Sequence, residues 1–169
     1  KIILLLKIKS LSWGHSAVSP TIVHRLVDMF NNNVLPLLFE MGSLGASGDL
    51  APLAHLSLPL IAEGEVHYNG KVQKSIKVLQ EMGWSAIKLQ AKEGLAMLNG
   101  TQFSAAYGVW STIKARKLSK WADLIAAISM DAFACVTSPF DDRLHQIRAH
   151  KGQIATAKVI RTLLDGSEL

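Results

Sequence analysis

The residues of this chain that could do chemistry gather first in a glycine-rich loop, residues 40–48. Its glycines stand at positions 42, 45 and 48, and it ends with Ala46, Ser47 and Gly48. Glycine loops ahead of helices can cradle a phosphate, but this spacing is neither Gly-x-Gly-x-x-Gly nor the lysine-containing P-loop. By itself, such a loop is more often a flexible turn. The tripeptide is nevertheless the sharpest candidate site.

A second candidate is Asn99, which precedes Gly100 at the end of a predicted helix over residues 93–98. Asn-Gly at this place is typical of a helix C-cap. An asparagine amide can also donate a hydrogen bond to an oxygen on which negative charge gathers. The two functions are compatible in one residue, although the local sequence favours the cap.

The histidines and the cysteine suggest structural functions. His145 and His150 lack the His-Glu-x-x-His pattern, so we expect no metal site, and we expect His55 to pack on its helix. Cys135 is the sole cysteine, which excludes an internal disulfide. Its apolar surroundings, residues 132–136, predict a buried and inert thiol, as suits a cytoplasmic protein.

Helices must position these candidates. Apolar periodicity and capping residues predict helices over residues 20–31, 50–60, 93–98, 102–135, 141–148 and 153–164. Ser19-Pro20 begins the first, while Asp49 and Thr101 are the expected N-caps of the second and of the long one. The second helix is apolar nearly all round and is therefore predicted to be buried.

A single hairpin is the only predicted β-structure. Asn69-Gly70 lies between the apolar residues Val66, Tyr68 and Val72, which favours a tight turn in a two-stranded ribbon. The fold class is therefore mainly α.

The long predicted helix carries an apolar stripe that steps by threes and fours. Its members are Ala106, Trp110, Ile113, Leu118, Trp121, Ile125, Ile128, Ala132 and Cys135. Such a stripe requires partner helices, which predicts a bundle of long helices. Trp110 and Trp121 are accordingly expected in the core rather than in a ligand pocket.

Composition sets the outer bounds. The 169 residues are 49% hydrophobic and 18% charged, with a mean hydropathy of +0.24, which excludes disorder and favours a deeply buried piece. No run approaches the about 18 apolar residues of a membrane span. The net charge is +5, but only Lys114, Arg116, Lys117 and Lys120 cluster, at the spacing of a solvated helix face, so we expect no nucleic-acid partner. We expect residues 1–169 to form a single partial domain of a longer protein.

Three stretches carry a resemblance to a known family. Residues 42–55 read GSLGASGDLAPLAH, residues 92–102 read KEGLAMLNGTQ and residues 148–153 read RAHKGQ. Together they resemble the histidine and aromatic amino acid ammonia-lyases, and residues 6–11 and 33–36 also fit, so the resemblance covers essentially the whole chain. Three departures are local: Ala17 stands where that family usually has glycine, and Ala149 and Lys151 stand where it has prolines.

The resemblance implies that Ala46, Ser47 and Gly48 cyclise without an external cofactor to a methylidene-imidazolone (MIO). The nitrogen of Gly48 would attack the carbonyl carbon of Ala46, and Ser47 would lose its hydroxyl as water to leave an electrophilic methylidene carbon. Small residues on either side of the serine suit this strained ring closure. The resemblance also implies that Asn99 donates a hydrogen bond to the ring oxygen.

The implied protein is a carbon–nitrogen lyase, a cytoplasmic homotetramer with the mainly α, fumarase/aspartase-like fold of ammonia-lyases. Residues 1–169 would be its central part, and its expected reaction is deamination of L-histidine, a small-molecule substrate, to urocanate. The implied site comprises Ala46, Ser47, Gly48 and Asn99, with no metal. Because that family's catalytic tyrosines match nothing here, we expect the isolated chain to be inactive.

Two alternatives remain open at the level of sequence. One is a phenylalanine or tyrosine ammonia-lyase, or a related aminomutase, that shares the same electrophile. The other is an inactive α-helical interaction module whose tripeptide no longer cyclises.

Overall fold

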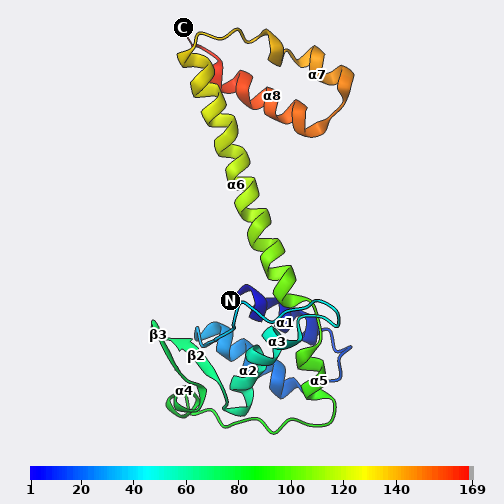
Figure 1. Cartoon of the computed structure of the whole chain (residues 1–169), viewed down its shortest axis with the longest axis vertical. Coiled ribbons are helices and arrows are strands. Elements are labelled where there is room, and N and C mark those ends of the chain that lie inside the picture. Colours follow the sequence, from blue (N-terminus) through cyan, green and yellow to red (C-terminus); the bar gives the residue numbers. More distant parts are fainter. Residues whose placement is uncertain (168–169) are drawn as a thin grey trace. The chain divides into compact units, whose positions relative to one another are not determined.

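The computed structural model describes residues 1–167. The chain divides into two compact units, of which the first is Lys1–Val109 and the second begins at Trp110. Helices dominate each unit (Figure 1). The longest helix, α6 (Gln102–Ala132), begins in the first unit and continues in the second. The predicted mainly α fold class is confirmed.

The first unit holds most of the elements. In chain order they are α1 (Ile2–Ser12), α2 (Pro20–Asn31), β1 (Leu35–Pro36), α3 (Leu50–Ser57), the 3-10 helix η1 (Leu58–Ile61), β2 (Glu65–Tyr68), β3 (Lys71–Lys74), α4 (Ser75–Glu81) and α5 (Glu93–Leu98). Helices α2, α3 and α5 confirm the predictions, whereas α1 and α4 were not predicted. The second predicted helix changes to 3-10 geometry near Pro59, which has no N–H to donate to a helical hydrogen bond.

The core of this unit is aliphatic. Its fully or nearly fully buried members are Leu4, Leu11, Ile22, Leu26, Met29, Val34, Leu56, Leu60, Val66, Val78 and Met97. They come from α1, α2, α3, η1, β2, α4 and α5, with Val34 just before β1, so one core joins the elements that carry both candidate segments. The site therefore lies on a packed scaffold.

The sheet has three strands rather than the predicted two. The hairpin of β2 and β3 turns at Asn69 and Gly70, both with positive φ, as a tight turn demands. Strand β1 adds to β2 in antiparallel register, with Leu35 opposite His67. A two-residue strand containing a proline has no alternation to detect, which is why sequence periodicity missed it.

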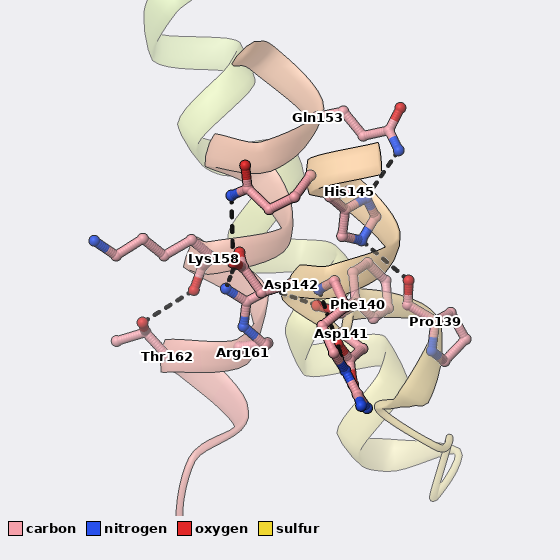
Figure 2. A network of polar contacts seen from close by, with 11 residues as sticks. Pro139, Phe140, Asp141, Asp142, His145, Gln153, Lys158, Arg161 and Thr162 are labelled. Atoms are coloured by element: carbon pink, nitrogen blue, oxygen red, sulfur yellow. Dashed lines mark hydrogen bonds and ion pairs between the residues drawn. The ribbon is translucent and has the colours of Figure 1, made fainter. Parts of the chain in front are cut away.

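The second unit consists of the rest of α6, the 3-10 helix η2 (Ser138–Phe140), α7 (Asp142–Arg148) and α8 (Lys151–Leu164). Figure 2 shows a polar network that ties η2, α7 and α8 together. The ring of His145 lies 3.1 Å from the carbonyl of Pro139 through Nε2 and 2.8 Å from Gln153 Nε2 through Nδ1. Arg161 donates to the carbonyl of Phe140 and to Asp142.

Three burial expectations for α6 and the turn after it are wrong for this chain. The helix ends at Ala132, and Cys135 lies beyond it as an exposed free cysteine. Trp110 and Trp121 are 53% and 52% exposed. Within the described chain nothing covers most of the apolar stripe, because the partner helices that it requires are not among these residues.

Two of the local departures from the family pattern adopt left-handed backbone. Ala17 has φ 54°, a conformation that glycine takes without strain. Ala149 has φ 52°, which a proline ring cannot adopt, so the loop between α7 and α8 differs here from one built with proline. Among residues 1–167, no helix has the length and apolarity needed to cross a membrane.

Candidate active site

The tripeptide lies in a tightly turned, solvent-accessible loop. Ala46 and Ser47 are exposed, and bridge pairing joins Gly45 and Ala46 to Gly48, so the backbone folds back on itself within a few residues. Gly48 has φ 91°, a left-handed value that favours glycine. The loop therefore presents a small residue and a serine to solvent on a closely folded backbone.

The Asn99–Gly100 segment lies directly against this loop. A Cβ atom placed on Gly48 would stand 2.5 Å from the carbonyl oxygen of Gly100, and the N–H of Asp49 donates to that same oxygen at 2.8 Å. No side chain fits at position 48 unless one of the two backbones moves. The structure thus brings together the two segments that the sequence singled out separately.

Asp49 stands at the N-cap position of α3, as predicted, but its carboxylate does not cap that helix. It accepts hydrogen bonds from Ser104 N (2.9 Å), Ser104 Oγ (2.7 Å) and Ser43 Oγ (2.8 Å). The expected function is therefore corrected: Asp49 holds the first turn of α6 and the glycine loop. Burial raises the pKa of Asp49, but the hydrogen bonds from Ser104 and Ser43 outweigh it and hold the pKa below its ordinary value.

Asn99 ends α5 in an extended conformation, with φ −85° and ψ 144°. Its side-chain Nδ2 donates to the carbonyl of Leu95 at 3.0 Å, and its backbone N–H donates to the same oxygen at 3.1 Å. The predicted C-cap is confirmed. The amide is exposed and bonds to Leu95 rather than to the tripeptide in this structure.

Sequence reasoning missed Lys7, which lies under this segment. Lys7 is only 1% exposed, and its Nζ donates to the carbonyls of Ala96 and Asn99, each at 2.8 Å. Desolvation by burial lowers the pKa of Lys7 to about 8. A signal existed, because Leu4, Lys7 and Leu11 share one face of α1 and two of the three are core leucines.

Glu93 ties down the opposite end of α5. This 2% exposed carboxylate accepts from the backbone N–H groups of Gln90 (2.6 Å) and Ser19 (2.8 Å). Those hydrogen bonds hold the pKa of Glu93 below its ordinary value. A buried anion thus lies at the first turn of α5 and a buried cation at its last carbonyls, the arrangement that the helix dipole favours.

A pocket and a half-buried histidine lie near these segments. A pocket of about 360 Å³ opens beside Asn99, lined by His15, Ser16, Lys92, Leu95, Ala96 and Asn99. His55 is half-buried with its ring edge-on to Phe39, 5.0 Å between centroids, which confirms its packing function. In the part of the chain that the structure describes, no group of three or more His, Cys, Asp or Glu side chains is arranged to hold a metal ion.

Comparison with known proteins agrees with the geometry. A family model described as "Aromatic amino acid lyase" matches residues 1–169. Histidine ammonia-lyase of Legionella pneumophila (strain Corby) is 46% identical over 168 residues, which cover 99% of this chain and 33% of that protein. The chain thus spans about a third of the length of the curated relatives it matches.

Solved structures lead to the same group. The crystal structure of histidine ammonia-lyase from Trypanosoma cruzi superposes with a TM-score of 0.90 at 38% identity, covering 97% of this chain and 33% of that one. Tyrosine aminomutase from Streptomyces globisporus gives 0.91 at 38% identity, covering 98% and 31%.

Proposed function

Because this chain belongs to the aromatic amino acid lyase family, we propose that it is the central part of an ammonia-lyase that deaminates L-histidine to urocanate. Residues 1–169 are, on this proposal, a single partial domain of a longer polypeptide. The high identity to histidine ammonia-lyases supports the choice of substrate. Phenylalanine or tyrosine ammonia-lyase activity and aminomutase activity remain the alternatives, since a tyrosine aminomutase and a phenylalanine ammonia-lyase share the fold.

The observation that carries the proposal is the contact between Gly48 and Gly100. A tripeptide that must close on itself needs a tightly folded backbone with no side chain at its third residue, and Gly48 meets both conditions. Ala46, Ser47 and Gly48 therefore fit the MIO group and would provide it. When formed, this group supplies an electrophilic carbon that ordinary side chains lack.

Other residues of the chain hold the tripeptide loop and the Asn99 segment in place. Asp49 donates its N–H to Gly100 and anchors Ser43 and Ser104, which keeps the two segments in contact. Asn99, exposed at the end of α5, provides an amide donor for an oxygen that gains negative charge. The exposed Ala46 and Ser47 leave room for a small amino acid substrate.

The general base and the cover for α6 come from outside residues 1–169 in this proposal. The apolar stripe of α6, exposed in this chain, is suited to packing against helices of other subunits in a cytoplasmic homotetramer. No external cofactor and no metal are required.

The test uses the full-length protein and its Ser47→Ala variant. The parent should lose the mass of two waters in intact mass spectrometry and form urocanate from L-histidine faster than it forms cinnamate or coumarate from phenylalanine or tyrosine. Ser47→Ala should keep the circular dichroism of the parent but lack both the mass change and the activity. Ser10→Ala, exposed on α1, is the matched control and should behave as the parent.

Each other outcome selects an alternative. A preference for phenylalanine or tyrosine favours the related lyases or aminomutases. A parent that retains both waters favours an inactive interaction module. Near-normal turnover by Ser47→Ala would refute the assignment of the electrophile to the tripeptide.

A further inference from the structure

Lys7 is a buried cation that the proposed function does not use. Placing an ammonium group out of water is costly unless charge and hydrogen bonds compensate. Within residues 1–167 no carboxylate forms an ion pair with Lys7, and its partners are the two carbonyls at the end of α5. A methionine or leucine at position 7 would fill the same buried space beneath α1 without the desolvation cost of a charge. The presence of the ammonium group therefore needs an explanation.

The two carbonyls that Lys7 binds lie one turn apart. The chain leaves the helix at Asn99, so neither Ala96 nor Asn99 has the following helical turn to supply a donor for its oxygen. The ammonium satisfies both oxygens, and its positive charge lies at the end of the helix where the dipole is negative. Lys7 therefore anchors the backbone of Asn99 through its carbonyl oxygen.

Gly100, the residue after Asn99, connects this anchored backbone to the tripeptide. The Gly100 oxygen accepts from Asp49 N, and the Gly100 backbone fills the space where Gly48 would carry a side chain. The Asn99–Gly100 peptide is thus held between Lys7 on one side and the Gly48–Asp49 backbone on the other. Beyond it, the carboxylate of Asp49 fixes Ser104. Lys7 is the anchor on the Asn99 side of this segment.

We propose that Lys7 is a positioning residue for Asn99, whose ammonium fixes the backbone that carries the Asn99 amide against the tripeptide loop. This inference rests on the proposed function, in which that amide acts at the electrophile. Misplacing a donor by about 1 Å costs up to about 100-fold in rate, so an anchor of this kind matters to turnover more than to substrate binding.

The test compares Lys7→Met, Lys7→Arg and the control Lys9→Met in the full-length protein. Lys9 lies on the same helix but is exposed. For Lys7→Met we expect the loss of two waters to be complete, kcat to fall about 10- to 100-fold and KM to stay within about threefold. Lys7→Arg, which keeps the charge and can reach carbonyl oxygens, should recover most of kcat, and Lys9→Met should match the parent.

A double-variant cycle separates positioning from general destabilisation. If Lys7 acts through Asn99, adding Lys7→Met to Asn99→Ala should slow the enzyme no further than Asn99→Ala alone. Multiplied effects would overturn the proposal, as would parental kcat in Lys7→Met or a failure of that variant to lose the two waters.

A further pair of outcomes covers the case in which the Lys7→Met variant does not fold. If Lys7→Met does not accumulate as folded protein, Lys7→Gln replaces it, because a glutamine amide can still donate to these carbonyls, and an intermediate kcat is expected. If neither variant folds, Lys7 is a folding determinant and the proposal is overturned. A parent that retains both waters contradicts the proposed function, whereas an active parent with an unimpaired Lys7→Met contradicts this inference alone.

Discussion

At Gly48, the absence of one carbon atom permits two backbones to touch. Gly45 lies three residues earlier with a similar positive φ of 72°, but a Cβ there would meet nothing within 4 Å. Alanine at position 45 would therefore introduce backbone strain alone, whereas alanine at position 48 would introduce strain and also break the contact with Gly100.

We predict that Gly48→Ala prevents the loss of two waters in the full-length protein, because its methyl group would push Gly100 away from the loop. Gly45→Ala should retain the mass change and lose only about 1 kcal/mol of stability to left-handed strain. Intact mass spectrometry and thermal denaturation of both variants test this. Equal mass changes in the two variants would show that the Gly48–Gly100 contact does not matter.

Lys7 should make stability depend on pH. Its pKa in the folded state is lowered to about 8 from the ordinary 10.5, so between these values the unfolded chain holds a proton that the folded chain has released. The free energy of unfolding contributed by Lys7 must then rise with pH from about 8 to 10.5 and be flat below 8. Comparing the melting temperatures of the parent and Lys7→Met across this range isolates the effect. A parallel pair of curves would contradict it.

At the scale of elements, the segment from η2 to α8 contains two arginines that form ion pairs but differ in exposure and in partners. The side chain of Arg161 is 31% exposed and donates to both the Phe140 carbonyl and Asp142 (Figure 2). The side chain of Arg143 is 89% exposed and donates to Asp141, two residues away. Of these two arginines, Arg161 is the one that joins elements separate in sequence, α8 to η2 and α7.

We therefore expect Arg161→Met to cost about 1–3 kcal/mol, the range for hydrogen bonds to a charged group whose partners lose their donor. Arg143→Met should leave the melting temperature unchanged, since exposed ion pairs contribute little. Thermal denaturation of both full-length variants tests the contrast. If the two variants lose equal stability, the network in Figure 2 does not hold α8 to η2.

At the scale of the whole molecule, the residues that the structure describes supply neither the general base of the proposed reaction nor a cover for the apolar stripe of α6. The tyrosines of the chain, Tyr68 in β2 and Tyr107 in α6, lie in regular elements, whereas the base that the resemblance implies is a tyrosine in a loop. Apolar side chains on α6, among them Ile113, Leu118 and Ile128, are more than half exposed.

Expressed alone, the chain should therefore form no urocanate and should associate through its apolar surface. Assays of urocanate release and light scattering on the purified chain check both expectations. A soluble monomer with measurable turnover would contradict the proposal that the base comes from outside these residues.

Sequence alone determined what depends on local chemistry. Helical periodicity and caps predicted α2, α3, α5, α7 and α8, and Asn69-Gly70 predicted the hairpin, because these signals act within a few residues. The candidate site was also found from sequence, since the tripeptide and Asn99 lie in long and specific motifs. The two-residue strand β1 is too short to show alternation, and α1 is apolar on most of its surface, so periodicity did not mark it as a helix; the lysine among its leucines was the one signal that it offered.

Only the tertiary structure decided which groups meet. That Gly100 fills the space beside Gly48, that Asp49 holds α6 instead of its own helix, and that Lys7 lies beneath Asn99 depend on contacts between segments far apart in sequence. Burial likewise follows from neighbours: Cys135 has an apolar setting in sequence but is exposed where the partner helices are absent. The residue type specifies which interactions a side chain can form, and the packing of the chain specifies the groups with which it forms them.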